Sequence, residues 1–430
     1  MSNLLAARGQ MAISLAFHIV FAVAGIAMPF MMVIAEARWL KCGDAEYRDL
    51  ANRWAKGTAI LFAVGAVSGT VLSFELGLLW PQFMKWAGAI IGMPFSLEGF
   101  AFFTEAIFLG IYLYGWKRVS PAAHLAAGII VAVSGAASAL FVVIANAWMN
   151  APAGFLLQDG QPASIDPIAA MMNPAALPQA IHMVLAAYAS CGFAVAGIHA
   201  WLLLKNRHSR FNRYALQIAF LTGGVAACLQ PFSGDFLARV VAHNQPVKLA
   251  AMEGQFQTER GASLRIGGMP NETTRRTEYA IEIPYGLSLL ALHDAHGMIK
   301  GLEDFARDDW PPVVVVHVSF QVMVAAGFVM MGMAVWGFRK WKRGQLFDSD
   351  RFLRALMWTS PLGFIAVESG WVVTEVGRQP WIIHGVMRTA DAVTPMPGLV
   401  VPFVTFTLLY VFLSVVVVWV LLRQFKEAHA

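Results

Sequence analysis

Residues 398–422 read GLVVPFVTFTLLYVFLSVVVVWVLL and contain no charged side chain. A run of about 20 predominantly apolar residues is long enough to cross the hydrocarbon core of a bilayer as a helix. A helix satisfies all of its own backbone hydrogen bonds, which a segment surrounded by lipid must do. The segment therefore predicts a membrane-spanning helix.

Eight further segments have the same apolar character. They cover residues 11–35, 55–79, 94–116, 124–148, 180–204, 214–236, 311–338 and 355–375. The whole sequence is 58% hydrophobic and 13% charged, whereas soluble domains are about 45–50% apolar and about 25% charged. We therefore expect an all-α integral membrane protein, a bundle of nine transmembrane helices, rather than a soluble enzyme.

Basic residues gather after every second predicted helix. They lie in the stretches 38–56, 117–118, 205–213 and 339–354, while the loop 149–179 has no Lys or Arg. Because loops rich in Lys and Arg stay in the cytoplasm, we expect a periplasmic N-terminus and a cytoplasmic C-terminus. The net charge of +5 follows from this topology, so it does not indicate nucleic-acid binding.

The three cysteines are Cys42, Cys191 and Cys228, and none belongs to a CxxC or CxxCH motif. A disulfide framework, a zinc site and covalently attached c-type haem are therefore not expected. We expect the cysteines to pack as small apolar residues.

The stretch 237–310 interrupts the pattern because it is long and mixed in charge. Long loops in compact proteins are usually functional or disordered. Two helix-like stretches, 247–257 and 292–305, favour an ordered, functional loop on the outer side. We therefore divide the chain into residues 1–236, the outer loop 237–310, and residues 311–430.

Ionisable groups inside a membrane are costly, so each is a functional candidate. The predicted spans contain His18, Glu75, Glu98, Glu105, His182, His199, His317, Glu368 and Glu375. A neutral imidazole at His18 could bind haem iron or hydrogen-bond to a neighbouring helix, and position alone leaves both open. His182 and Met323 would suit a low-spin haem together, although a single Met usually packs in the core. We expect His199 and His317 to make polar contacts in the bundle.

Two pairs of acids are spaced seven residues apart. Glu98 and Glu105 form one pair, and Glu368 and Glu375 form the other. Two helical turns place both members on one face, about 10 Å apart. Such acids can relay protons through water, and a carboxylate can bind a high-spin haem iron. Ion pairing with Arg378 or helix capping is the alternative.

Gln245, Lys248 and Glu253 lie in the outer-loop sequence NQPVKLAAMEGQF, residues 244–256. Lys and Gln can donate hydrogen bonds to a quinone oxygen, and Glu can accept the proton that an oxidised quinol releases. A solvated loop face is the alternative interpretation.

Several motifs resemble cytochrome bd quinol oxidase subunit I. They are QMAISLAFHIVF (10–21), PFSLEGFAFFTEAIF (94–108), SALFVVIANAWMN (138–150), KLAAMEGQF (248–256) and AVESGWVVTEVGRQPW (366–381). The similarity covers essentially the whole chain, and the GRQPW motif is specific. The resemblance implies a haem-bearing subunit of the bacterial inner membrane that oxidises quinol on the periplasmic side and reduces O2 to water.

The resemblance also implies a set of haem sites. His182 and Met323 would be the axial ligands of a low-spin haem b. His18 would hold one high-spin haem, and Glu375 or Glu98 would bind or serve the other. The cofactors would be low-spin haem b, high-spin haem b, and either haem d or a third haem b.

Other residues take supporting roles by the same resemblance. Glu98 and Glu105 would belong to a proton path from the cytoplasm. The remaining residues would line the haem and quinol sites: Arg378 and Trp371 beside a haem, Asn146 and Ser138 facing the same site, and Lys248, Glu253 and Gln245 at the quinol. Partners would be subunit II of similar fold, a small single-helix subunit, ubiquinol or menaquinol, O2 and lipid.

The sequence departs from the family pattern in two ways. Gln321, two residues before Met323, stands where Arg is common, which predicts a different haem propionate contact or low-spin potential. The loop after IPYG (283–286) is short. Together these features favour the cyanide-insensitive branch, in which haem b can replace haem d.

Two other functions fit parts of the pattern. A proton-coupled transporter would use the intramembrane acids, but it predicts two matching halves with broken helices, and we find no such symmetry. A dihaem electron carrier would use His182 and Met323 and leave His18, Glu98 and Glu375 without a role.

Overall fold

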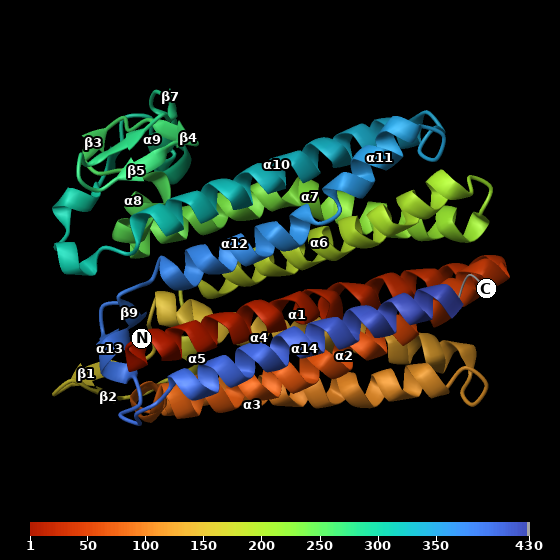
Figure 1. The fold of residues 1–430 in the computed structure, drawn as a ribbon, viewed down its shortest axis with the longest axis horizontal. Helices are drawn as coiled ribbons and strands as arrows, with labels where there is room; N and C mark the ends of the chain where they lie inside the picture. The colour runs from red at the N-terminus through yellow and green to blue at the C-terminus, as the bar shows by residue number, and fades with distance from the viewer. Residues whose placement is uncertain (428–430) are drawn as a thin grey trace.

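The computed structural model describes residues 1–427 and shows a bundle of long helices (Figure 1). Within this part of the chain, eight helices are long and apolar enough to cross a membrane. They are α1 (Asn3–Cys42), α2 (Ala45–Leu79), α3 (Pro81–Tyr114), α4 (Pro121–Asn150), α6 (Ala176–Lys205), α7 (Arg210–Asn244), α10 (Val313–Lys342) and α14 (Val400–Glu427). The predicted all-α membrane class is confirmed.

The helices extend beyond the apolar segments. Helix α1 has 40 residues, about 60 Å, or twice the thickness of the hydrocarbon core. Only Gly43 and Asp44 join α1 to α2; Gly43 has a φ of 72°, and the Asp44 side chain caps α2 through the N–H of Glu46. The basic residues of 38–56 therefore lie on helix ends rather than in a loop, which corrects the prediction. Long charged side chains reach water without ending a helix.

The eighth predicted segment, 355–375, is not one continuous helix, and that part of the prediction is wrong. Helix α11 (Asp350–Thr359) ends before Ser360, and α12 (Leu362–Val376) begins after Pro361. The series of helical hydrogen bonds is interrupted here because Pro361 has no N–H to donate to the preceding turn. Helix α12 has 15 residues, about 22 Å, which is shorter than the hydrocarbon core. The count of nine crossings therefore stays a prediction.

The break allows α11 and α12 to pack closely on α6. A Cβ on Gly363 would lie 2.3 Å from the Cα of Ser190, and a Cβ on Gly197 would lie 2.4 Å from the Cβ of Ser360. Glycine at these two positions therefore allows the backbones of α11 and α12 to lie close to that of α6. Helix α12, which carries Glu368, Trp371 and Glu375, is held against α6 in this way.

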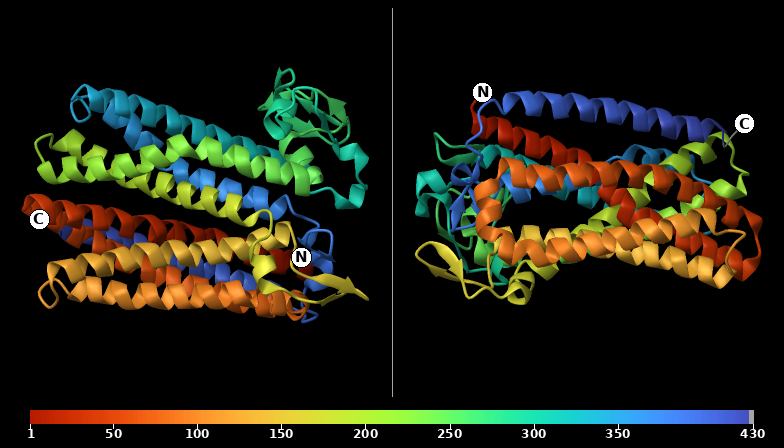
Figure 2. Two further views of the ribbon diagram at one scale, coloured as in Figure 1. Left: turned by 180° about the vertical axis from the view of Figure 1, so that it is seen from behind. Right: turned by 90° about the horizontal axis from the view of Figure 1, so that it is seen from below.

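The long helices pack mainly with their sequence neighbours: α1 with α2, α3 with α4, and α6 with α7. Helix α10 packs against α12 and α7, and α14 lies along α1 (Figures 1 and 2). Large apolar side chains such as Phe74, Phe100 and Phe412 are exposed on α2, α3 and α14. Extended exposed apolar surface of this kind marks contact with lipid or with another subunit.

Short segments gather at the end of the bundle where the chain begins, which we call the N-terminal end (Figure 1). Strands β1 (Leu156–Gln158) and β2 (Gln161–Ala163) pair there, as do β9 (Trp381–Ile383) and β10 (Met387–Arg388). The short helices α5 (Pro167–Met171) and α13 (Thr389–Ala392) lie close by.

The chain between α7 and α10 is ordered at this same end. It begins with α8 (Pro246–Glu253) and continues as three nested antiparallel pairs. These are β3 (Glu259–Arg260) with β8 (Met298–Ile299), β4 (Leu264–Ile266) with β7 (Ile281–Ile283), and β5 (Met269–Asn271) with β6 (Arg276–Glu278). Helix α9 (Gly286–Leu292) and two 3-10 turns, Leu302–Asp304 and Arg307–Asp309, complete the segment.

Only one of the two predicted helical stretches in this segment is a helix. Stretch 247–257 is α8 as far as Glu253. Stretch 292–305 is not helical, because His293 ends α9 with a φ of 55° and Met298–Ile299 is a strand. Ile299 is buried against Leu249 and Ala262, so its apolar side chain serves a contact between segments rather than one helix face.

Candidate active site

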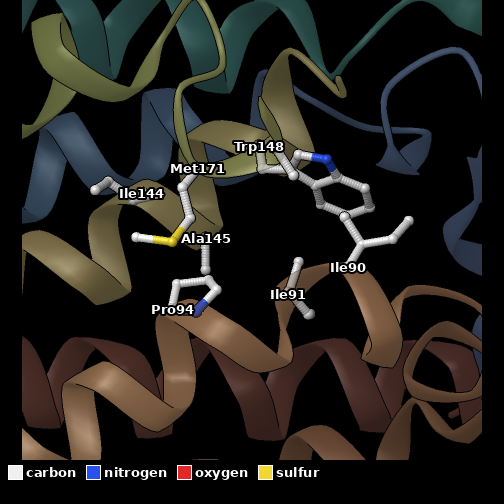
Figure 3. A pocket seen from close by; sticks show the side chains of 8 residues that line it. Ile90, Ile91, Pro94, Ile144, Ala145, Trp148 and Met171 are labelled. Atoms are coloured by element: carbon white, nitrogen blue, oxygen red, sulfur yellow. The ribbon is translucent and has the colours of Figure 1, made fainter. Parts of the chain in front are cut away.

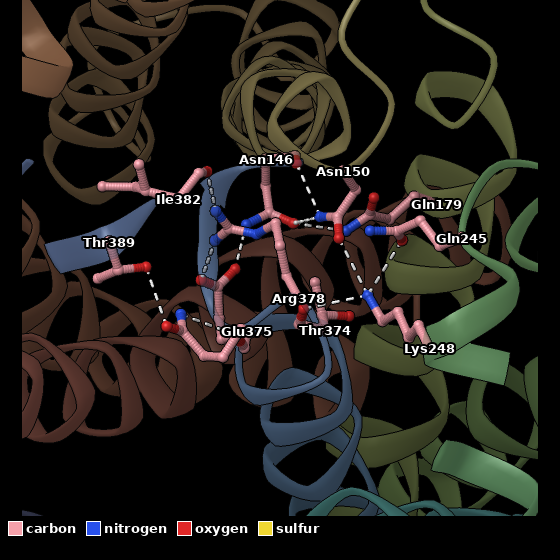
Figure 4. Close-up of polar contacts among 11 residues, drawn as sticks. Asn146, Asn150, Gln179, Gln245, Lys248, Thr374, Glu375, Arg378, Ile382 and Thr389 are labelled. Atoms are coloured by element: carbon pink, nitrogen blue, oxygen red, sulfur yellow. Dashed lines mark hydrogen bonds and ion pairs between the residues drawn. The ribbon is translucent and has the colours of Figure 1, made fainter. Parts of the chain in front are cut away.

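A hydrogen-bonded network joins α4, α6, α8 and α12 at the N-terminal end (Figure 4). Its acidic centre is Glu375 in the last turn of α12, which accepts hydrogen bonds from Asn146 at Oε1 and from Arg378 at Oε2, the latter at 2.5 Å. Arg378 also donates to the carbonyl of Ile382, and Gln179 donates to Oδ1 of Asn146 at 2.8 Å. The structure therefore brings Glu375, Arg378 and Asn146 together, including the ion pair that was the alternative role of Glu375.

Lys248 of α8 enters the same network from the side of the outer segment. Its Nζ donates to Oδ1 of Asn150 at 3.0 Å, to the carbonyl of Thr374 at 3.1 Å, and to Oε1 of Gln245 at 3.4 Å. All three ammonium hydrogens thus have acceptors. Burial lowers the pKa of Lys248 to about 7, and the neighbouring Arg378 charge acts in the same direction.

Glu253 lies on a different face of α8. Glu253 follows Lys248 by five residues, which corresponds to about 140° of helix rotation. Its Oε2 is buried and makes no hydrogen bond to the described residues. Burial raises the pKa of Glu253 to about 7, and the Arg265 charge opposes that shift. The two predicted quinol residues therefore do not share a hydrogen-bonding partner, and a substrate touching both would lie across α8.

His18 lies at the contact between α1 and α2. Its Nδ1 is 3.0 Å from Oγ of Ser68, which leaves Nε2 as the ring nitrogen available to iron. A Cβ on Gly69 would lie 2.9 Å from Cε1 of His18, so the ring lies directly on the backbone of α2.

His182 and Met323 lie on α6 and α10, two helices that pack against α12. Nδ1 of His182 is 3.0 Å from Ser233 Oγ, and its Nε2 is 3.1 Å from the side-chain amide of Gln230. Binding iron through Nε2 would therefore require Gln230 to turn away. The sulfur of Met323 lies 3.0 Å from where a Cβ on Gly370 of α12 would be. Helix α12 packs against both α6, which carries His182, and α10, which carries Met323.

Glu98 and Glu105 both face α4, as their spacing predicts. Ser138 donates to Glu98 at 3.1 Å. A Cβ on Gly135 would lie 3.1 Å from Oε1 of Glu105, and this side chain is buried with 5% of its surface exposed. The two acids thus follow one another along the α3–α4 contact and have few hydrogen-bonding partners there.

Three other predicted residues lie near these groups. Gln245 is buried and caps the junction of α7 and α8. Both polar ends of Gln321 are bound by the outer segment, through the N–H of Gly267 at 3.0 Å and the carbonyl of Arg265 at 3.1 Å. Trp371 of α12 has a buried Nε1 without a hydrogen bond to the described residues.

His199 and His317 make the expected polar contacts. His199 bonds to Asn212, and His317 bonds to the carbonyls of Met252 and Gly267.

Sequence reasoning missed two members of the network and assigned no role to one buried acid that it had named. Asn150 and Gln179 were not predicted, although Asn146 and Asn150 stand four apart in an apolar helix, a spacing that places two amides on one face. Glu75 was given no role, yet its Oε1 accepts hydrogen bonds from Gln10 and Ser14, both at 2.9 Å.

Two hollows lie at the N-terminal end. One is a narrow apolar crevice between α3, α4 and α5, bordered by Ile91, Pro94 and Trp148 and too tight for a water molecule (Figure 3). Its lining offers no polar group to a quinol or an ion. The other is a cavity of about 260 Å³ lined by Asn150, Asn244 and His384, among others, so it borders the network of Lys248.

The donor set fits haem. An iron porphyrin takes one or two protein ligands from imidazole or thioether groups, and the predicted ligands His18, His182 and Met323 pack on Gly69, Gly234 and Gly370, respectively. The absence of a Cβ at each glycine leaves room for the ring or the sulfur of the ligand against the neighbouring helix. Glu368 and Trp371 add buried polar atoms without partners among the described residues, which a bound group can satisfy.

Known proteins resemble this chain over nearly its full length. The family model of cytochrome bd terminal oxidase subunit I matches residues 6–429. A cytochrome bd menaquinol oxidase subunit I of Bacillus subtilis (strain 168), so named provisionally, is 37% identical and covers 99% of this chain and 97% of its own. The cytochrome bd ubiquinol oxidase subunit 1 of the same organism is 31% identical, with 99% and 94% covered.

The fold agrees with a solved structure. The bd oxidase of Geobacillus thermodenitrificans matches with a TM-score of 0.93 and 39% identity, covering 99% of this chain and 98% of that one. Fold and sequence thus agree along the length of the molecule. The chain belongs to the cytochrome bd terminal oxidase subunit I family, as an integral membrane subunit of a quinol oxidase that carries haem and works with subunit II.

Proposed function

We propose that this chain oxidises quinol at α8 on the periplasmic side and delivers the electrons to an oxygen site beside Glu375. The observation that carries the proposal is the network of Figure 4, in which the side-chain amides of Asn150 and Asn146 link Lys248 of the outer segment to Glu375 of α12. A substrate site and a haem-side carboxylate that are far apart in sequence thus lie next to each other. The transporter and electron-carrier alternatives do not agree with the family assignment.

At the quinol site, Glu253 accepts a proton from the substrate hydroxyl and Lys248 orients the substrate oxygen. Glu253 suits a base because it has an unpartnered oxygen and a pKa of about 7. Lys248 can bind a quinol oxygen by exchanging its longest hydrogen bond, the one to Gln245 at 3.4 Å. Gln245 would then be free to contact the substrate as well.

The haem ligands would be distributed over four helices. His182 and Met323 would hold the low-spin haem b, His18 one high-spin haem, and Glu375 the other. Haem would supply electron transfer and oxygen binding when it is present, and the chain would supply the ligands to iron and the charges around them. Each oxygen of Glu375 has two lone pairs, so Glu375 can bind iron while it keeps Asn146 and Arg378. Arg378 and Trp371 would flank this haem, with Gln321 near the low-spin site.

Protons for water formation would come from the opposite end of the bundle through Glu105 and Glu98, with Ser138 holding Glu98. The basic helix ends would lie in the cytoplasm and the N-terminus in the periplasm. Charge would then cross the membrane without a proton pump. The third haem would be haem d or haem b, and a small single-helix subunit and lipid would complete the complex.

The test is the visible spectrum of the purified complex. We expect His182→Ala to remove the low-spin haem band and to abolish quinol-driven turnover, because the axial imidazole is lost. His199→Gln is the matched control, since His199 lies on the same helix and contacts Asn212 instead. A low-spin band that persists in His182→Ala would reject the assignment.

A further inference from the structure

The connection between Lys248 and Glu375 is a string of two side-chain amides. Oδ1 of Asn150 accepts from Lys248 at 3.0 Å, and its Nδ2 donates to Oδ1 of Asn146 at 3.3 Å and to the Asn146 carbonyl at 3.0 Å. Nδ2 of Asn146 in turn donates to Glu375. The string therefore runs from a cation on the outer segment to the carboxylate of α12.

The direction of both amides is set by the groups at the two ends. An ammonium group has no acceptor, so only the oxygen of Asn150 can face Lys248. A carboxylate has no donor when ionised, so only the nitrogen of Asn146 can face Glu375. Turning either amide over would place two donors or two acceptors against each other. Because Asn150 is 5% exposed, a lost partner there is not replaced freely by bulk water.

Close packing adds a second constraint on the same contact. A Cβ on Gly377 would lie 3.0 Å from Cε of Lys248, so the lysine stem lies against the end of α12. Lys248 is thus held by the α12 backbone on one side and by Asn150 on the other. A shift of α8 would be transmitted to α12 and α4 together.

We propose that Asn150 is a positioning residue that couples occupancy of the quinol site on α8 to the placement of Glu375 at the oxygen site. The inference rests on the roles proposed above for Lys248 and Glu375. When a quinol oxygen takes over one hydrogen bond of Lys248, the change is passed through Asn150 and Asn146 to the carboxylate. Coupling of this kind is reciprocal, so the state of the Glu375 haem also changes quinol affinity.

The experiment measures the coupling without turnover. Decylubiquinone and a short-chain menaquinone are titrated into the oxidised, purified complex, and the absorbance and EPR signals of the high-spin haem are recorded. In the unmodified protein we expect quinone binding to shift these signals. In Asn150→Ser we expect the shift to vanish and the quinone Kd to rise about tenfold, because one hydrogen bond to a charged group is lost.

A second variant separates the two halves of the string. Asn150→Asp keeps an acceptor for Lys248 and loses the donor to Asn146, so quinone should still bind within about twofold of normal while the haem signal no longer responds. Asn173→Ser is the matched control, because Asn173 is also buried at this end but bonds to the carbonyls of Ala170 and Ile144. It should leave the response intact.

Two outcomes would overturn the inference: a haem response that persists in Asn150→Ser and Asn150→Asp, or no response in the unmodified protein. Failure of the proposed function looks different. In that case Glu375→Ala would keep all high-spin haem, or Lys248→Ala and Glu253→Ala would leave quinone affinity unchanged.

Discussion

Glu375 and Glu105 are both acids turned into the same bundle, yet their surroundings differ. Both oxygens of Glu375 are bound, by Asn146 and by Arg378, and these partners have further partners of their own. Glu105 instead lies against Gly135 with the weakly bonded Glu98 two turns away. Glu375 is therefore held by several hydrogen bonds, whereas Glu105 has few polar neighbours.

The difference suits two kinds of task. An acid that must keep one geometry, as an iron ligand does, benefits from partners that restrict its rotamer. An acid that must accept and release protons is better without a fixed cation, because a tight ion pair holds it ionised. Surroundings therefore separate the two roles, although both acids belong to the same seven-residue pattern.

The largest effect is expected from removing the densely held acid. Glu375→Ala should lose the high-spin haem that we propose Glu375 binds and reduce oxygen consumption to background, because Arg378 would also lose its buried partner. Haem extraction and the reduced-minus-oxidised spectrum measure the loss. His199→Gln is again the control, because His199 bonds to Asn212 and has no proposed role at a haem. Full haem content in Glu375→Ala would remove the distinction between the two acids.

A smaller effect on activity is expected from replacing Glu105, the acid with few polar neighbours. Glu105→Gln should retain all haems and slow oxygen reduction about 100-fold or more, as expected when a proton-transferring group is removed. Stopped-flow oxidation of the reduced enzyme by O2 measures this step separately from quinol oxidation. If Glu105→Gln instead lost haem, Glu105 would have the same role as Glu375.

The smallest effect is expected at Glu253, which lies in the outer segment and has a buried oxygen without a partner among the described residues. Glu253→Gln should slow quinol oxidation while O2 still binds the reduced enzyme. A base with a pKa of about 7 is active when deprotonated, so the unmodified rate should fall about tenfold per unit below pH 7. The pH profile of kcat/KM checks this.

Lys248 has a pKa of about 7 as well, so both groups titrate in the same pH range. The contribution of Glu253 is therefore the difference between the kcat/KM pH profiles of the unmodified protein and of Glu253→Gln. A profile that keeps its acidic limb in Glu253→Gln would assign the base to another group. Loss of O2 binding in the variant would place Glu253 in a structural role.

Much of the fold could be read from composition. In lipid, backbone groups must hydrogen-bond to each other, so an apolar run such as 398–422 is expected to be a helix, and α14 covers it from Val400 onward. The prediction failed where composition is not the deciding factor. At 355–375 a single proline divides the helix, and at 292–305 apolar residues serve a contact with α8 rather than a helix of their own.

The candidate site shows the same division. Local sequence pointed to Glu375, because an ionisable group in apolar sequence is conspicuous, and the family resemblance added Arg378 and Lys248. It did not reveal that Lys248 meets Asn150, 98 positions away, or that Asn146 meets Glu375, 229 positions away. The membrane helices themselves were determined by the sequence through bonds that close within each segment. The contact of α8 with the network around Glu375 was decided by tertiary structure, because it depends on how four helices approach one another.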